Sequence, residues 1–338
     1  MYRKLQHNFD IIQYLLKDIS AEQLAWRNPK DSLTLDEIIE RLNRLEQWHH
    51  ASLRLHPIKI PTLCFAPFGV DAISRKVAHC PCNFETYVDS RRHTLAMLKD
   101  IPEPYFQMRH PRFGLLTLAD LIPKIDAYDQ AHIRQIESII RCMPLNPLLI
   151  RAKCEIDSYH RRYQFHLQQA QSVLDIGVGT GLALNHIMQN HPQIRFAGVD
   201  VRDLRLPEIN IPLQIYNGHT LPFADNQFDV SLLFYVLHHC QNPERVLDEA
   251  VRVTRQKIVL IEEFDRPDAD EISLDLTERH GHRAIGLPSD MPYQLFSKPE
   301  FEMMLSAHGL VQLDQQRLPS RTTRPVEKFL YVTQLATT

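Results

Sequence analysis

The sequence predicts an all-α four-helix bundle followed by a doubly wound α/β domain, and three observations support this order. The chain has 338 residues, which at roughly 150 residues per domain suggests two domains. Only two of its ten glycines, Gly69 and Gly114, lie in the first 149 residues, where apolar residues recur with a helical period. The second half alternates short β-branched runs with helical stretches and holds three glycines within five positions.

Amphipathic helices are expected in the first domain over residues 2–17, 34–55, 83–98 and 117–140. The second begins at Thr34-Leu-Asp-Glu37 and the fourth at Thr117-Leu-Ala-Asp120. Both segments are typical of a capping box, in which two side chains bond the backbone N–H groups at a helix start. A long, proline-containing connection over 57–81 joins the second helix to the third. Four such helices with one long crossover predict a bundle.

The second domain opens with a pattern that is typical of nucleoside-binding folds. Residues 172–176 form a short apolar strand, Gly177-Val-Gly-Thr-Gly181 forms a loop, and 194–200 form a second strand that ends in Asp200. Glycines let the backbone approach a ligand, and the following helix offers free N–H groups to an anion. The acid can accept two hydrogen bonds from a ribose diol. The pattern predicts a nucleoside-containing cofactor at the carboxyl ends of the strands.

Composition and charge exclude several classes of protein. With 41 acidic and 38 basic residues, the net charge of −3 gives no general affinity for nucleic acid or for an anionic membrane. Apolar runs fall short of the roughly 18 residues of a transmembrane helix, and the N-terminus lacks a signal-peptide core, so a cytoplasmic protein is expected. The fragment His79-Cys-Pro-Cys82 has no second Cys/His pair at finger spacing, so it predicts no metal site.

The glycine loop distinguishes two classes of cofactor. Dinucleotide-binding loops read G-x-G-x-x-G, whereas this chain has G-x-G-x-G preceded by Asp175. That pattern resembles the first motif of class I S-adenosylmethionine-dependent methyltransferases. Later blocks resemble, in order, the adenine-side loop, the fourth strand, the next helix and the fifth strand of the type 11 group: 217–229, 230–239, 243–253 and 257–262. The resemblance implies a Rossmann-like, seven-stranded sheet that closes with an antiparallel pair at 310–318 and 327–335.

The same resemblance implies that the cofactor is S-adenosyl-L-methionine and gives the cofactor site its residues. The backbone of Gly177, Gly179 and Gly181 would contact the methionyl part of the cofactor. Asp175 would meet its ammonium group, directly or through water. Asp200 would bind both ribose hydroxyls.

Three more positions complete the implied cofactor site. Asn217 stands where the group often has an acid at the adenine amine, and its amide oxygen can also accept there. Phe234 and Tyr235, at the end of the fourth strand, would line the sulfonium through cation–π contact.

Candidate catalytic residues follow the carboxyl ends of strands four and five. Methyl transfer needs a base only where the nucleophile carries a proton that must leave early. His239, His238 and Glu262 are the candidates for that base. The acceptor pocket is expected to draw on 156–163 and on the polar insert 265–294, which suggests a polar, small-molecule methyl acceptor.

The first domain resembles the DinB family of four-helix bundles through residues 32–46 and 114–136. Members often bind a divalent metal through a histidine on helix two and an H-x-x-x-H pair on helix four. In this sequence the corresponding positions are Arg41, Tyr128 and His132, so one ligand of three is present. An arginine repels a cation, so we interpret the site as degenerate and expect no metal there. His132 is then expected to be a hydrogen-bonded core histidine.

These patterns divide the chain into a bundle at 1–143, a linker and lid helix at 144–170, and a methyltransferase domain at 171–338. The bundle is expected to pack over the acceptor entrance or to mediate a homodimer. Two alternatives stay open. One is a methyltransferase that acts on protein or RNA, with the bundle as a docking module. The other is a metal-dependent transferase seated in the bundle. Residues that would mark a docking surface in the first case are Arg91, Arg92, Arg109 and Arg112.

Overall fold

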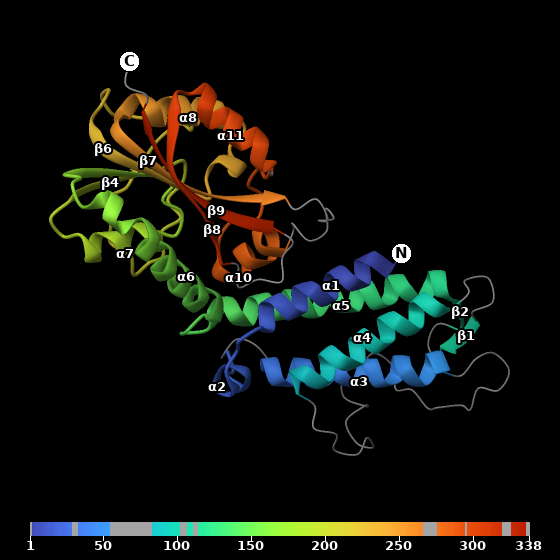
Figure 1. Cartoon of the computed structure of the whole chain (residues 1–338). Coiled ribbons are helices and arrows are strands. Elements are labelled where there is room, and N and C mark those ends of the chain that lie inside the picture. Colours follow the sequence, from blue (N-terminus) through green and yellow to red (C-terminus); the bar gives the residue numbers. More distant parts are fainter. Residues whose placement is uncertain are drawn as a thin grey trace. The chain divides into compact units, whose positions relative to one another are not determined.

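The computed structural model describes residues 2–28, 33–54, 83–101, 107–110, 114–265, 276–294, 296–319 and 326–335. Contacts divide the chain into two compact units, both drawn in Figure 1. The helical unit comprises Met1–Pro147 and Arg283–Ile285. The α/β unit comprises Leu148–His282 and Gly286–Thr338.

Each of the four helices predicted for the first domain is present in the helical unit: α1 (Tyr2–Leu16), α3 (Leu35–Arg54), α4 (Phe84–Asp100) and α5 (Leu118–Cys142). Helices α1 and α3 each pack against both α4 and α5, as Figure 1 shows. The sequence analysis missed the short helix α2 (Ala21–Ala25) and an antiparallel hairpin of β1 (Gln107–His110) and β2 (Gly114–Thr117).

Both predicted capping boxes are confirmed. The backbone N–H of Thr34 donates to Glu37 Oε2 at 2.8 Å, and that of Glu37 donates to Thr34 Oγ1 at 3.2 Å. Thr117 and Asp120 make the same reciprocal pair at the start of α5, at 2.9 and 3.3 Å. These bonds satisfy N–H groups that have no partner inside a helix, so they fix where α3 and α5 begin.

A charged group lies in the core of the helical unit. The Nη1 and Nη2 atoms of Arg91, on α4, donate to the two carboxylate oxygens of Asp129, on α5, at 3.1 and 2.6 Å. The Nε atom of Arg91 lies 2.9 Å from Oε1 of Glu46, on α3. All three side chains have no exposed surface. Burial acts to raise the pKa of Glu46, but Arg91 and hydrogen bonds hold it at about 2. One guanidinium therefore joins three helices.

The α/β unit contains a seven-stranded sheet with helices and short turns around it. Its helices are α6 (Pro147–Tyr163), α7 (Leu182–Asn190), α8 (Pro243–Val253) and α11 (Lys298–Ala307). The short helix α10 (His282–Ile285) is divided, with His282 in the α/β unit and Arg283–Ile285 in the helical unit. Its strands are β3 (Ser172–Ile176), β4 (Arg195–Asp200), β5 (Gln214–Ile215), β6 (Phe228–Phe234), β7 (Thr254–Asp265), β8 (Leu310–Leu318) and β9 (Val326–Leu335). Its short helical turns are η3 (Gln164–Leu167), η4 (Leu237–His239) and η5 (Leu276–Gly281).

The sheet has the doubly wound topology that the sequence predicts. The strand order is β5-β4-β3-β6-β7-β9-β8, and β9 runs antiparallel to both of its neighbours. The expected C-terminal antiparallel pair is thus confirmed. The chain turns from one side of β3 to the other between β4 and β6, so the carboxyl ends of β3, β4 and β6 meet at a topological switch point. In open α/β sheets this is where ligands bind.

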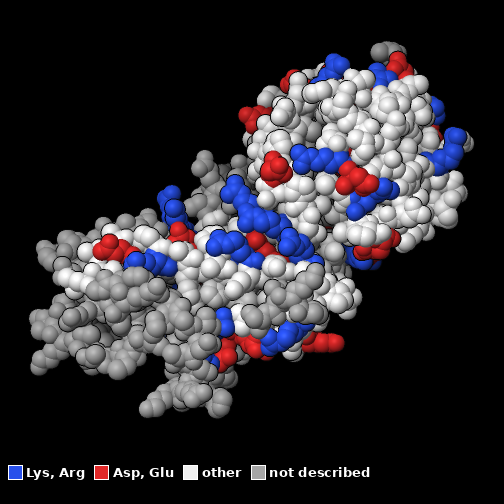
Figure 2. All heavy atoms as spheres, turned by 180° about the vertical axis from the view of Figure 1, so that it is seen from behind, with Lys and Arg blue, Asp and Glu red and all other residues white. Residues whose placement is uncertain are grey.

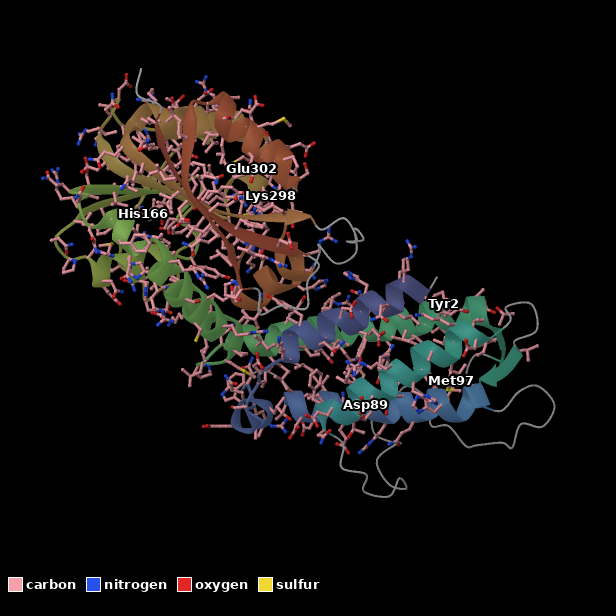
Figure 3. The ribbon with its side chains drawn as sticks, viewed as in Figure 1. Tyr2, Asp89, Met97, His166, Lys298 and Glu302 are labelled. Atoms are coloured by element: carbon pink, nitrogen blue, oxygen red, sulfur yellow. The ribbon has the colours of Figure 1, made fainter. Side chains whose placement is uncertain are left out.

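Two apolar cores cover the two faces of the sheet. One contains Leu233 and Leu260 with residues of α8 and α11, and the other contains Leu232 and Ile261 with residues of α6 and α7. Side chains alternate between faces along each strand, so neighbours in sequence enter different cores. Helix α11 is also tied to the sheet by Glu302, which pairs with Lys298 at 2.6 Å (Figure 3) and accepts from Tyr331 on β9 at 3.2 Å.

Charged side chains of both signs lie next to each other on the face of the α/β unit seen in Figure 2. This mixture agrees with the net charge of −3. Among the described residues, no helix combines the length and the apolarity that a membrane span needs.

A pair of histidines joins α6 to the end of α7. Nε2 of His160 lies 2.9 Å from Nε2 of His191, and both residues are buried. When both rings are neutral, one Nε2–H donates a hydrogen bond to the other Nε2. Two protonated rings would have no acceptor here and would repel each other. Burial, together with the charges of His186 and His191, lowers the pKa of His160 to about 4.

We expect this pair to make the α/β unit sensitive to acid. Between pH 6.5 and about 4, His160 is protonated in the unfolded chain but stays neutral in the folded chain. Stability therefore rises with pH in this window and is lost as the pH falls, by about 1–2 kcal/mol between pH 7 and 5. Urea unfolding followed by circular dichroism should show a smaller loss in His160→Phe than in the wild type. The same loss in His160→Phe and in an exposed control, His219→Asn, would contradict the prediction.

Candidate active site

The glycine loop follows β3 and precedes α7, as the sequence predicts. Gly177, Gly179 and Gly181 all have left-handed backbone conformations, with φ of 80°, 53° and 78°. A Cβ atom added to Gly177 would lie 2.5 Å from Cγ2 of Val236, and one added to Gly181 would lie 2.8 Å from Cγ2 of Ile209. A Cβ atom on Gly179 would meet nothing within 4 Å. Gly177 and Gly181 thus allow close packing within the protein, while Gly179 borders open space that a ligand can approach.

Two buried acids stand beside this loop. Asp200, at the end of β4, accepts from the backbone N–H of Gly179 at 2.8 Å and from that of Arg202 at 3.2 Å. Asp175 lies on β3 and is 2% exposed. Burial, and then the charge of Asp200, raises the pKa of Asp175 to about 7. A ligand with a positive charge would be favoured here, because it would offset the burial and the charge of Asp200, which both disfavour ionisation of Asp175.

We expect cofactor affinity to depend on pH through Asp175. If the ammonium group of the cofactor binds the ionised carboxylate, affinity scales with the ionised fraction, which falls as the pH drops below about 7. Dissociation constants of S-adenosylmethionine and its demethylated product should therefore be about fivefold larger at pH 6 than at pH 7, a range in which the cofactor's amino group stays mostly protonated. Calorimetry on wild type and Asp175→Asn tests this. The variant should show a nearly flat profile, and an equal slope in both proteins would assign the titration to another group.

The chain leaves β6 in a tight turn that comprises Tyr235–Cys240, here called the β6 turn. Tyr235 has a φ of 58°, which is rare for a residue other than glycine. Its ring lies 5.3 Å from Nζ of Lys328, and the ring of Phe234 lies 5.3 Å from that of Tyr163. Tyr235 thus already faces a cation of the protein, whereas Phe234 packs on the helix that precedes β3. Their expected roles at the sulfonium stay predictions.

The three candidate bases lie together at the carboxyl ends of β6 and β7. Nδ1 of His238 lies 2.6 Å from Oε2 of Glu262, and the other oxygen, Oε1, accepts from the backbone of Val236 and Leu237 at 2.9 and 3.1 Å. Nδ1 of His239 donates to the carbonyl of Pro292 at 2.8 Å. Glu262 is fully buried and accepts hydrogen bonds from three donors, whereas His239 is partly exposed.

Part of the polar insert reaches the same place. The rings of Tyr293 and His239 are 6.0 Å apart, and those of His282 and His239 are 5.9 Å apart. The backbone N–H of Gln294 donates to the carbonyl of His238 at 2.9 Å. Residues 266–275 of the predicted insert lie outside the described residues. The described part brings an imidazole and a phenol to the candidate bases.

Asn217 follows β5 and shapes the next turn. Its Oδ1 atom accepts from the backbone N–H groups of His219 and Thr220, both at 2.9 Å. The oxygen that was expected at the adenine amine therefore already holds its own loop, and the adenine role of Asn217 stays a prediction. Val201, directly after Asp200, is 51% exposed. A Cβ atom added to Gly218 would lie 3.3 Å from Cγ1 of Val201.

Sequence reasoning missed two residues at the site. Val236 contacts Gly177, and Tyr163 lies close enough to Asp175 for that charge to add to burial in raising the pKa of its phenol. Tyr163 belongs to a segment that was predicted only as part of the acceptor pocket. No local signal marks Val236, because its place depends on how β6 pairs with β3.

The positions at which the resemblance to DinB bundles leads one to expect metal ligands lie on α3 (Arg41) and α5 (Tyr128 and His132). Nδ1 of His132 donates to the carbonyl of Tyr128 at 2.9 Å, and burial together with the charge of Arg41 lowers the pKa of His132. Within the described part of the chain, no group of three or more potential ligands could hold a metal ion. The fragment 79–82 lies outside that part.

The prediction that Arg91 marks a docking surface is wrong. Arg91 was a candidate for a basic surface patch, but it is fully buried between Asp129 and Glu46. Arg92 is exposed and pairs with Asp89 on the same helix at 3.6 Å. The side chain of Arg109 and all of Arg112 lie outside the described residues. Helical periodicity explains the difference, since neighbouring residues on a helix face about 100° apart.

Comparisons of the sequence with known proteins find methyltransferases. Residues 174–261 match the family model described as a methyltransferase domain. The chain is 26% identical over 161 residues to the phosphatidylethanolamine N-methyltransferase of Cereibacter sphaeroides, a match that covers 44% of this chain and 79% of that protein. It is 30% identical over 114 residues to the demethylmenaquinone methyltransferase of Symbiobacterium thermophilum, covering 29% of this chain and 45% of that protein.

A solved structure with a related outline is the 1,6-didemethyltoxoflavin-N1-methyltransferase of Burkholderia thailandensis, which contains S-adenosylhomocysteine. The identity is 15% and the TM-score 0.43, with 62% of this chain and 90% of that chain covered. The chain spans as little as 35% of the length of a curated relative that it matches. The family model thus describes residues 174–261, about a quarter of the chain, as a methyltransferase domain.

Proposed function

We propose that this chain transfers a methyl group from S-adenosylmethionine to a small-molecule acceptor. The observation that carries the proposal is the place of the glycine loop within the matched domain: its Gly179 borders open space beside two buried acids, Asp175 and Asp200. S-adenosylmethionine supplies a methyl group on a positively charged sulfonium, and its amino-acid part adds an ammonium. A site with two carboxylates suits both charges.

The residues of the α/β unit then take these roles. Asp175 faces the ammonium group, Asp200 binds the ribose hydroxyls, and the loop from Gly177 to Gly181 contacts the methionyl part. Where the acceptor carries a proton on its nucleophilic atom, His238 or His239 receives it. Both histidines follow β6, at the edge of the sheet where the loop also lies. Holding acceptor and cofactor in line is expected to supply most of the acceleration, since the leaving group is already activated.

We assign the helical unit an auxiliary role. The support is the resemblance of residues 32–46 and 114–136 to DinB bundles, together with Arg41 at a position where that family has a metal ligand. It would cover the acceptor entrance or form a homodimer. Deleting residues 1–143 should lower the activity or the molecular mass of the native assembly, and a variant unchanged in both would contradict this role.

Titration calorimetry of the full chain with S-adenosylmethionine and S-adenosylhomocysteine tests the proposed activity. Micromolar binding of both is expected, followed by transfer of a labelled methyl group to one member of a panel of small phenols, enols and amines. If neither ligand binds the folded wild type, the proposal is wrong. If the cofactor binds but only protein or RNA becomes labelled, the acceptor class is wrong and the cofactor is right.

A further inference from the structure

The β6 turn presents two backbone N–H groups in the same direction. Tyr235 has a left-handed conformation, with φ of 58°, and Val236 follows with a right-handed one, φ −109° and ψ −50°. Successive residues of opposite hand form a concave nest of N–H groups that binds an anion. In this turn the anion is the carboxylate of Glu262, whose Oε1 accepts from Val236 and Leu237 at 2.9 and 3.1 Å.

Glu262 has no exposed surface, and its second oxygen contacts Nδ1 of His238 at 2.6 Å. One buried carboxylate therefore holds three consecutive residues of the turn. The next residue on β7, Glu263, points to the opposite face of the sheet, where it lies 3.5 Å from Nζ of Lys328. The chain thus has two buried glutamates side by side in sequence: Glu262 accepts from the backbone of the β6 turn, whereas Glu263 pairs with Lys328.

The β6 turn in turn supports the glycine loop. The side chain of Val236 lies so close to Gly177 that a Cβ atom there would be 2.5 Å from Cγ2 and 3.1 Å from Cγ1 of Val236. At the other end of the turn lies the thiol of Cys240. Burial raises the pKa of this thiol to about 12, together with the negative charges of Glu262 and Asp200. A shift of the turn would move the surface against which Gly177 packs.

We propose that Glu262 is a positioning residue for S-adenosylmethionine: it holds the β6 turn, and the β6 turn, through Val236, holds the glycine loop in its binding conformation. The inference rests on the proposed function for the identity of the ligand. It differs from the role of base that the sequence suggests for Glu262, because the carboxylate acts here through the backbone of Val236 and Leu237.

Two substitutions separate the two roles. Glu262→Gln keeps an oxygen that can accept from Val236 and Leu237 and removes the charge beside His238, whereas Glu262→Leu removes both. Calorimetry with S-adenosylmethionine should give a dissociation constant within about threefold of wild type for Gln and at least about twentyfold larger for Leu. The matched control Glu263→Gln should bind as wild type. Equal losses for Gln and Leu, or no loss for folded Leu, would overturn the proposal.

A second pair of measurements keeps the inference testable if Glu262→Leu does not fold. Val236→Ala leaves Glu262 intact and removes the contact with Gly177, so it should weaken binding about tenfold. Unchanged binding would overturn the proposal. Amide exchange in the free protein needs no ligand: Glu262→Gln should leave residues 176–182 as protected as in wild type, and Val236→Ala should expose them. If exchange behaves so but wild type binds no S-adenosylmethionine, the proposed function fails and the coupling stands. Protection unchanged in Val236→Ala would overturn the coupling itself.

Discussion

Replacing Asp200 with alanine should raise the dissociation constant of S-adenosylmethionine at least about 100-fold. The carboxylate is 8% exposed and accepts from the backbone of Gly179 and Arg202, so it ties the end of β4 to the glycine loop. It is also the residue expected to bind the ribose hydroxyls. Losing hydrogen bonds to a charged, buried acceptor costs about 1.5–3 kcal/mol each, and two such losses exceed a 100-fold change.

Calorimetry on Asp200→Ala, Asp200→Asn and an exposed control measures this effect. Asparagine keeps an oxygen for the Gly179 N–H, so it should lose less than alanine. The control Asp203→Ala removes an acid three residues away that pairs with Arg205 at 2.7 Å on the surface, and it should bind as wild type. Alanine variants that bind equally well at both positions would show that the ribose is not held at Asp200. A melting curve for each variant separates weakened binding from unfolding.

The glycine loop could be predicted because the pattern that specifies it is local in sequence. A buried strand, three glycines and a second strand ending in Asp200 follow one another within 29 residues, from Ser172 to Asp200. The strand, the glycine loop and the helix follow one another directly in sequence. The folded chain adds longer-range bonds, in which the N–H groups of Gly177 and Val178 donate to the carbonyl of Val199, which precedes the acid. Short-range patterns of this kind specify turn, helix start and acid together.

The contacts that complete the site could not be predicted because they are long-range. Val236 meets Gly177 across 59 positions of sequence, and the meeting depends on the register in which Leu232 of β6 pairs with Asp175 of β3. A shift by one residue would send Val236 to the other face. The left-handed conformation of Tyr235 likewise has no signal in the sequence, since tyrosine rarely adopts it. The role of Glu262 as a ligand of that turn therefore required the folded chain.

The helical unit illustrates the same limit with charged residues. Its four helices follow from apolar periodicity, and the starts of α3 and α5 follow from their capping boxes. The periodicity gives no warning that Glu46, Arg91 and Asp129 all point inward. A charged residue on an apolar helix face is ordinarily expected at the edge of that face, near water. Here three helices each contribute one charged side chain to a single buried cluster.

Replacing Arg91 with methionine should destabilise the helical unit by about 3–5 kcal/mol. The substitution preserves much of the side-chain volume but leaves Glu46 and Asp129 buried without their common cation, and an uncompensated buried charge is far more costly than the loss of the pair's attraction. Both tryptophans of the chain, Trp26 and Trp48, lie in the helical unit, so urea unfolding followed by tryptophan fluorescence reports on this unit alone.

The neighbouring Arg92 supplies a matched control on the same helix. Its pair with Asp89 (labelled on α4 in Figure 3) is exposed on both sides, with 63% and 81% of the two side chains accessible, so Arg92→Met should change stability by less than about 0.5 kcal/mol. Removing all three charges, in Glu46→Leu, Arg91→Met and Asp129→Leu together, should recover much of the loss, because no buried charge is left unpaired. An Arg91→Met variant as stable as wild type would contradict the prediction. It would mean that the fully buried Glu46 and Asp129 do not need a cation between them for the helical unit to be stable.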